Sequence, residues 1–115
     1  MTSVTIYHNP KCSKSRQTLA LLEERDLKLR IVLYLDSPPS RSELSDIVKM
    51  LGVEATEIVR TGEDEYKESG LTAESREDDV LDAILIAPNL MQRPIVICGD
   101  QARVGRPPES ALEII

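Results

Sequence analysis

The apolar positions of this chain alternate between short runs typical of strands and longer stretches with helical spacing. The first strand is predicted over Val4–His8, and an amphipathic helix over Ser13–Arg25. A second, largely buried strand is predicted over Arg30–Leu35, and it ends before Pro38 and Pro39 because proline cannot continue a ladder of hydrogen bonds. A helix between two strands favours a parallel crossover, so these two strands are expected to be parallel.

The middle of the chain has the pattern of a helical block. Ser40 and Glu43 have the spacing of a capping box ahead of apolar residues at helical spacing, and Gly52 is a natural stop for that helix. Three further helical patterns are punctuated by glycine and proline, and they cover Glu54–Arg60, Glu63–Ser69 and Arg76–Ala87.

The last part of the chain predicts a hairpin and a short helix. Ile95–Cys98 and Gln101–Gly105 flank the dipeptide Gly99-Asp100, whose leading glycine is typical of a type II′ turn between antiparallel strands. Glu109–Ile115 is expected to form the C-terminal helix. The complete order predicts an α/β, thioredoxin-like fold: a mixed four-stranded sheet with a helical insertion between strands 2 and 3.

Length and composition narrow the class of protein. The 115 residues, 41% of them hydrophobic, predict a single domain over residues 1–115. A net charge of -6 and the absence of Trp and Phe argue against nucleic acid as a ligand. The N-terminus lacks a signal-peptide pattern and no apolar stretch approaches membrane-spanning length, so the expected location is the cytoplasm and no membrane partner is expected.

The chemistry-bearing residues point to a thiol rather than to a cofactor. Because the expected location is reducing, the two cysteines, Cys12 and Cys98, are predicted to be free thiols. No metal-ligand cluster, glycine-rich phosphate loop or dinucleotide fingerprint is present in the sequence, so no bound metal or cofactor is expected.

Cys12 is the main candidate for a reactive group. It stands where the first predicted helix begins, near unpaired backbone N–H groups and the positive end of the helix dipole, which favour thiolate over thiol. Lys11, Lys14 and Arg16 add positive charge nearby. The same N–H groups can bind an oxyanion, so one helix turn could activate the nucleophile and hold its substrate. The alternative is a cysteine that acts as a small buried apolar residue.

Several segments together carry a family resemblance. They are His8–Arg16 with Thr18-Leu19, then Tyr34-Leu35, Pro38-Pro39, Arg93–Val96 and Gly105–Pro108. Over nearly the whole chain, these segments resemble the ArsC family of glutathione- and glutaredoxin-coupled arsenate reductases, and the chain is most similar to its short bacterial members.

The resemblance implies a role for each of several residues. It implies a catalytic nucleophile at Cys12 and an oxyanion clamp, by which we mean the guanidinium groups of Arg60, Arg93 and Arg106. Guanidinium groups suit tetrahedral oxyanions because they bind two oxygens at once and stay charged. By itself, Arg60 would be a cation at the end of a helical segment. His8 is expected to support Cys12, either by adding positive charge or by orienting the loop.

Ser15 and Cys98 determine how the thiol can be regenerated. Ser15 stands where a dithiol oxidoreductase has its second cysteine, so an oxidised or adducted Cys12 must be resolved by an external thiol. Cys98 is predicted to be a small apolar residue of a strand, without a catalytic role.

The mechanism that the resemblance implies starts with attack of Cys12 on bound arsenate. Loss of water gives a cysteine–arsenate adduct, glutathione adds to it as co-substrate, and reduction by glutaredoxin releases arsenite. A phosphatase-type arsenate reductase is disfavoured, because it needs an arginine where Thr18 stands. Two alternatives stay open: an Spx-like regulator that binds RNA polymerase, for which Ser15 removes the cysteine-pair switch, and a monothiol glutathione-dependent oxidoreductase, for which the arginines are unnecessary.

Overall fold

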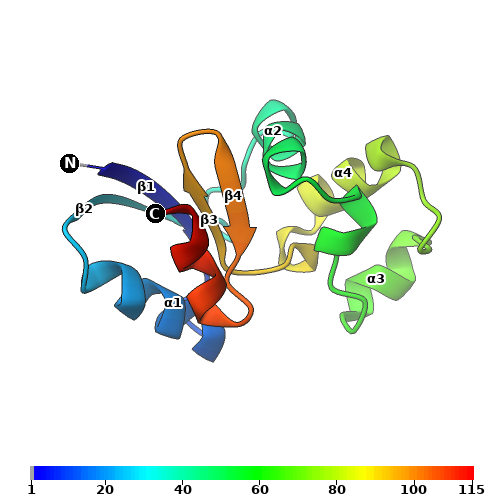
Figure 1. The fold of residues 1–115 in the computed structure, drawn as a ribbon. Helices are drawn as coiled ribbons and strands as arrows, with labels where there is room; N and C mark the ends of the chain where they lie inside the picture. Colours follow the sequence, from blue (N-terminus) through cyan, green and yellow to red (C-terminus); the bar gives the residue numbers. More distant parts are fainter. Residues whose placement is uncertain (1) are drawn as a thin grey trace. The chain divides into compact units, whose positions relative to one another are not determined.

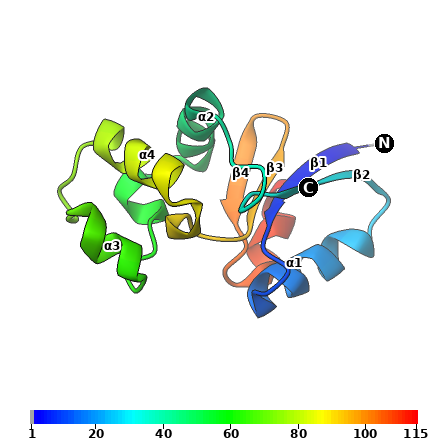
Figure 2. The ribbon, with the colours of Figure 1, turned by 180° about the vertical axis from the view of Figure 1, so that it is seen from behind.

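The computed structural model describes residues 2–115, which form two compact units. The first, called the sheet unit, contains the chain up to Ser37 and from Arg93 onward, and the second, called the helical unit, is Pro38–Gln92. The single domain predicted for residues 1–115 stays a prediction. Figure 1 and Figure 2 show the elements of each unit from opposite sides.

The sheet unit contains a mixed sheet of four strands. The strands are β1 (Thr2–His8), β2 (Leu27–Leu33), β3 (Ile95–Cys98) and β4 (Gln101–Val104), arranged in the order β2-β1-β3-β4. β2 is parallel to β1, whereas β3 pairs with β1, and β4 with β3, in the antiparallel sense. The predicted mixed four-stranded sheet and the parallel crossover are therefore confirmed.

Two helical segments accompany this sheet. They are α1 (Ser13–Glu23), which connects β1 to β2, and η3 (Pro108–Ile114), which is a 3-10 helix packed against β4 and α1. Apolar side chains from both segments and from β1 and β3 form one buried cluster, whose members are Val4, Ile6, Leu22, Val96, Ala111 and Ile114. Burial of this cluster fixes α1 on the sheet, and the short loop of residues 9–12 connects the end of β1 to the first turn of α1 (Figure 1).

The second strand differs from its prediction. It spans Leu27–Leu33 instead of Arg30–Leu35, and it is not largely buried: the exposed fractions are 46% for Ile31 and 41% for Leu33. The reason is its place at the edge of the sheet, where β1 is its one neighbouring strand among residues 2–115. A continuous apolar run is typical of a central parallel strand, and the sequence pattern does not distinguish a centre from an edge.

The predicted hairpin is confirmed. Cys98 pairs with Gln101, so Gly99 and Asp100 form a two-residue turn between β3 and β4. Gly99 has a φ of 64°, whereas no residue other than glycine among residues 2–115 has a positive φ. A positive φ at the first central residue alone is the type II′ pattern that a leading glycine predicts.

The helical unit confirms the predicted helical block. Its elements are α2 (Arg41–Leu51), η1 (Ala55–Ile58), α3 (Asp64–Ser69), α4 (Glu77–Ile86) and η2 (Pro88–Leu90). The capping box of α2 is present, with the Glu43 N–H donating to Ser40 Oγ at 3.1 Å and the Ser40 N–H donating to Glu43 Oε1 at 3.0 Å. Gly52 ends α2 with a φ of 70°. Within residues 2–115, no helix has both the length and the apolar character needed to cross a membrane.

Candidate active site

Cys12 is the N-cap residue of α1. Its backbone is extended, with φ −94° and ψ 123°, and its carbonyl accepts the first helical hydrogen bond from the Arg16 N–H at 3.0 Å. The loop before it is closed by the Cys12 N–H, which donates to the Asn9 carbonyl at 3.0 Å. The sulfur therefore lies at the end of the helix where backbone N–H groups are unpaired, as the sequence predicts.

The surroundings of Cys12 lower the pKa of its thiol. Partial burial alone would raise that pKa, but the opposing interactions are together stronger: hydrogen bonds from the backbone N–H groups of Ser15 and Lys14, and the guanidinium of Arg93. Each of these donors interacts more strongly with a thiolate than with a thiol. The predicted shift towards thiolate agrees with this geometry.

Two of the three predicted arginines lie at this thiol. Arg106 Nη2 is 3.5 Å from Cys12 Sγ, although the two residues are far apart in the sequence. The Arg106 guanidinium is held from its other side, because its Nε donates to the Arg93 carbonyl at 2.9 Å. The peptide bonds Arg93-Pro94 and Arg106-Pro107 are both cis. Cys12, Arg93 and Arg106 thus form one cluster, with two guanidinium groups beside one sulfur.

His8 and Ser15, on either side of the loop of residues 9–12, are joined by a short hydrogen bond. His8 Nδ1 is 2.6 Å from Ser15 Oγ, and Ser15 Oγ also accepts from the Asn9 N–H at 3.0 Å. Burial lowers the pKa of His8, and the nearby Arg16 lowers it further although Glu23 opposes the shift, so the imidazole is neutral at neutral pH. A neutral His8 that carries its proton on Nε2 accepts, at Nδ1, the hydrogen bond donated by the Ser15 hydroxyl. Of its two predicted roles, the geometry favours orienting the loop over adding charge.

Arg60 belongs to the helical unit. It follows η1, its backbone N–H donates to the Leu90 carbonyl at 2.7 Å, and its side chain forms an ion pair with Glu63 at 2.8 Å. In such an ion pair, the carboxylate offsets part of the positive charge of the arginine, and a bound oxyanion would have to replace that carboxylate as the partner of the guanidinium. The predicted place of Arg60 in the oxyanion clamp stays a prediction.

Comparison with known proteins agrees with the fold. The model of the ArsC family matches residues 7–114. The chain belongs to the ArsC family. Its relatives include YfgD of Escherichia coli K12, which is 48% identical over 97% of this chain and 96% of the relative. An arsenate reductase of Neisseria meningitidis is 47% identical over 96% of both chains. Among solved structures, an arsenate reductase from Vibrio cholerae superposes with a TM-score of 0.94 at 46% identity, over 99% of this chain and 98% of that one.

The second cysteine of this ArsC-family protein lies at the opposite end of β1. Cys98 pairs with Val4 near the start of β1, whereas Cys12 follows its last residue, His8. Cys98 is partly buried against the sheet unit's apolar cluster, and both cysteines are free. The structure thus gives Cys98 the apolar surroundings that the sequence predicts.

Tyr34 is a residue of this cluster to which the sequence analysis assigned no role. Its side chain is completely buried, and its hydroxyl lies near Asn9, Arg93 and Cys12. Burial raises the pKa of Tyr34, so the hydroxyl stays protonated and can only act as a donor towards an anion. The one sequence signal for Tyr34 was its presence in the dipeptide Tyr34-Leu35 of the family resemblance.

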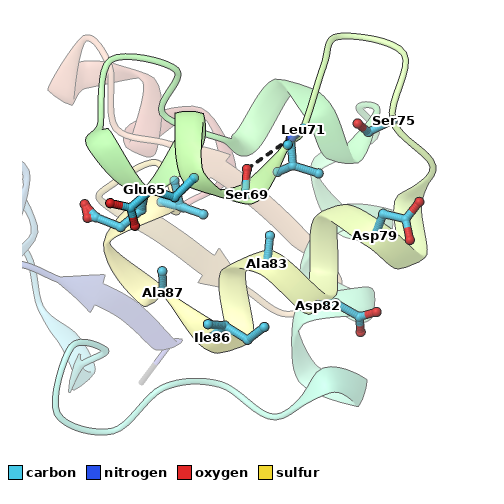
Figure 3. Close-up of a pocket in the computed structure, with 12 residues that line it drawn as sticks. Glu65, Ser69, Leu71, Ser75, Asp79, Asp82, Ala83, Ile86 and Ala87 are labelled. Carbon is cyan, nitrogen blue, oxygen red and sulfur yellow. Dashed lines mark hydrogen bonds between the residues drawn. The ribbon is translucent and has the colours of Figure 1, made fainter.

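A cavity away from the cysteine is also present in this structure. It has a volume of about 500 Å³, belongs to the helical unit and lies between α3 and α4, with Ser69 and Ala83 among the residues that line it (Figure 3). Two of its carboxylates are already engaged, Glu65 with Asn89 and Asp82 with Arg41. No group of three or more His, Cys, Asp or Glu residues within the described range 2–115 is arranged to hold a metal ion. The lowered thiol pKa and the two guanidinium groups beside the sulfur make the Cys12 cluster the candidate active site of this ArsC-family protein.

The lowered pKa of Cys12 predicts selective alkylation. With iodoacetamide, Cys12 is expected to react rapidly near neutral pH, with a midpoint of the rate–pH profile below the ordinary thiol value, because the thiolate is the reacting form. Mass spectrometry of the labelled protein measures the site and the rate. The rapid phase should survive in Cys98→Ser and disappear in Cys12→Ser; the reverse pattern would refute the assignment.

Proposed function

We propose that this ArsC-family protein reduces arsenate to arsenite, with Cys12 as the nucleophile and with glutathione and glutaredoxin as the source of electrons. The observation that carries the proposal is the contact of 3.5 Å between Arg106 Nη2 and Cys12 Sγ at the N-terminus of α1. The names of the relatives from Neisseria and Vibrio support the choice of arsenate as substrate.

Binding comes first in the proposed mechanism. Arsenate is a tetrahedral oxyanion, and the Arg93 and Arg106 guanidinium groups with the N–H groups at the start of α1 can each donate to its oxygens. Arg60 is proposed as the third arginine of the oxyanion clamp. Tyr34 and the neutral His8 add no negative charge to this cluster. The anion is thus held beside the sulfur that attacks it, which converts the reaction into a step within one complex.

The first covalent step leaves the arsenic in its +5 oxidation state. The Cys12 thiolate forms an S–As bond, one As–O bond breaks, and that oxygen takes up protons and leaves as water. The thiol of glutathione then forms a second S–As bond and displaces a second oxygen as water. The donors around the oxyanion stabilise the negative charge that the arsenate oxygens carry during both displacements.

Reduction follows with an external protein thiol. A glutaredoxin thiolate attacks the glutathione sulfur, so a disulfide forms between them and the electron pair of the As–S bond stays on arsenic, which becomes arsenic(III). Water then releases arsenite and restores the Cys12 thiolate. An external thiol is required because Ser15 stands three residues after Cys12 and Cys98 lies at the other end of β1. Such thiol chemistry fits the cytoplasm, the location proposed here.

A coupled assay tests the proposed function. Purified protein, glutathione, glutaredoxin, glutathione reductase and NADPH are mixed, and NADPH oxidation is followed at increasing arsenate concentration, with arsenite quantified as the product. Saturable oxidation that depends on arsenate, protein and glutaredoxin is the expected result. Oxidation that requires a glutathionylated protein substrate instead would favour the monothiol oxidoreductase, and the absence of turnover with either substrate would favour the RNA polymerase-binding regulator.

A further inference from the structure

Gly105 is packed tightly against Thr18 and Pro94, whereas an added Cβ at Gly99, the other glycine of the sheet unit, would have no atom within 4 Å. Gly105 follows β4 directly and is buried, and its N–H donates to the Pro94 carbonyl at 2.9 Å. A Cβ atom added at Gly105 would lie 2.6 Å from Thr18 Oγ1 and 2.8 Å from Pro94 Cγ. Both distances are far inside van der Waals contact, so no larger residue fits while these groups keep their places.

The two obstructing groups cannot easily yield. Rotation of the Thr18 side chain would exchange its hydroxyl for its methyl, and Cγ2 already lies 3.1 Å from the added Cβ position. Pro94 is a rigid ring, and both Thr18 and Pro94 are buried. A side chain at Gly105 would therefore move the end of β4, and with it the next residue, Arg106.

Thr18 connects the same place to the first turn of α1. Its hydroxyl donates to the Lys14 carbonyl at 2.9 Å and is 3.4 Å from the Gly105 carbonyl, so its single proton is directed towards the helix. Lys14 is one of the residues whose N–H interacts with the Cys12 sulfur. Thr18 is thus a fully buried polar side chain between the turn that surrounds the thiol and the segment that carries Arg106.

Arg106 is also held by hydrogen bonds from its backbone and its side chain to two backbone carbonyls. Its backbone N–H donates to the Val104 carbonyl at 2.9 Å, and its Nε donates to the Arg93 carbonyl, which precedes Pro94. The backbone from Arg93 to Pro94 therefore contacts Gly105 and Arg106 together. A displacement at Gly105 would be transmitted to the guanidinium of Arg106.

We propose that Gly105 and Thr18 are positioning residues that hold the Arg106 guanidinium beside the Cys12 sulfur. Gly105 has no side chain and the Thr18 hydroxyl donates to the Lys14 carbonyl, so both act through Arg106 and the first turn of α1. The inference deepens the proposed function, on which it rests for the identity of the substrate, because the same guanidinium is proposed to bind arsenate. A purely structural role would instead change stability and leave the thiol's reactivity as it is.

The test measures the rate–pH profile of Cys12 alkylation, which needs no arsenate. In a Cys98→Ser background, Gly105→Ala is expected to raise the midpoint of this profile by roughly one pH unit, because a cation is moved away from the thiolate. Gly62→Ala is the matched control, since nothing lies within 4 Å of a Cβ at Gly62, and it should leave the midpoint unchanged.

A double-mutant cycle separates positioning from general damage. If Gly105 acts through Arg106, then Gly105→Ala adds little to the midpoint of an Arg106→Ala protein, so the two shifts are far from additive. Additive shifts, or an unchanged midpoint in a folded Gly105→Ala protein, would overturn the inference.

Thr18 provides a second and independent pair of variants. Thr18→Val keeps the shape of the side chain and removes the hydroxyl, whereas Thr18→Ser keeps the hydroxyl. We expect the midpoint to rise in Thr18→Val and to be restored towards the original value in Thr18→Ser. This pair decides the question if Gly105→Ala does not fold, and equal midpoints in the two proteins would overturn the role of Thr18.

The outcome is distinguishable from failure of the proposed function. If the midpoints shift as expected while the unmodified protein does not reduce arsenate in the coupled assay, the positioning of Arg106 stands and the choice of substrate is wrong. If arsenate is reduced and the midpoints do not shift, the proposed function stands and the positioning role is wrong.

Discussion

Cys12→Ser is expected to abolish arsenate-dependent NADPH oxidation in the coupled assay, with a loss of turnover of at least about a thousandfold, as for other enzymes that lose their nucleophile. A serine hydroxyl at the start of α1 is not ionised near neutral pH, so the donors that stabilise the Cys12 thiolate have no anion to act on. Serine also cannot form the sulfur–arsenic bond of the adduct to which glutathione adds and which glutaredoxin then reduces. The measurement is the rate of arsenite formation.

Cys98→Ser is the matched control for this loss. It makes the same replacement of sulfur by oxygen, but at the opposite end of β1 and away from both arginines of the cluster. Turnover within about twofold of the original is expected, because a surface or half-buried change of this size leaves the Cys12 cluster in place. Substantial turnover in Cys12→Ser, or its loss in Cys98→Ser alone, would contradict the assignment of the nucleophile.

Arg106→Ala is expected to lower kcat/KM for arsenate by about 100- to 1,000-fold, the size typical for removal of one donor to a reacting oxyanion. The variant loses the guanidinium that lies 3.5 Å from Cys12 Sγ, so the pKa of the thiol rises and the substrate loses a bidentate donor. Arg106→Lys should restore little of the loss, because a point charge does not reproduce the planar fork. Steady-state kinetics and the alkylation profile of Cys12 measure the two effects separately.

Arg103→Ala is the control for the removal of a cation from this part of the chain. Arg103 lies on β4, and its Nε pairs with Glu113 Oε1 at 3.2 Å in a partly exposed ion pair. Such a pair contributes about 1 kcal/mol or less to the free energy of unfolding, so the variant should keep both its fold and its activity. If Arg103→Ala and Arg106→Ala reduce turnover equally, net charge rather than the donor at Cys12 is responsible. Arg60→Ala, measured in the same series, tests the third arginine of the proposed oxyanion clamp.

Much of the local structure was predictable because its causes are neighbours in the sequence. The capping box of Ser40 and Glu43, the left-handed stop at Gly52 and the turn at Gly99 each depend on the chemistry of adjacent residues. The place of Cys12 at the start of α1 has the same origin, since the residue directly before a helical pattern takes the N-cap position.

For the second strand, β2, the prediction from neighbouring residues was wrong. Its apolar content predicted burial, but burial depends on how many strands lie beside it, and within the described residues β2 pairs with β1 alone. The shift of its start to Leu27 has a related cause, because pairing with Thr2 at the beginning of β1 extends β2 towards the N-terminus. Neither fact is encoded within the strand's own residues.

In the candidate site, too, the properties set by neighbouring residues were predictable, whereas the contacts between distant segments were not predictable from local sequence. Local sequence sets the N-cap position of Cys12, the positive charges around it and the absence of a second thiol at Ser15, because these properties need only a strand followed by a helix. The contact between Arg106 and Cys12, and the close packing of Gly105 on Thr18, join positions 94 and 87 residues apart. Such contacts exist only after β3 and β4 have paired beside β1, since sheet pairing brings distant segments to the same edge. The family resemblance named Arg93 and Arg106 as candidates, but their position beside the sulfur is a consequence of tertiary structure and not of local sequence.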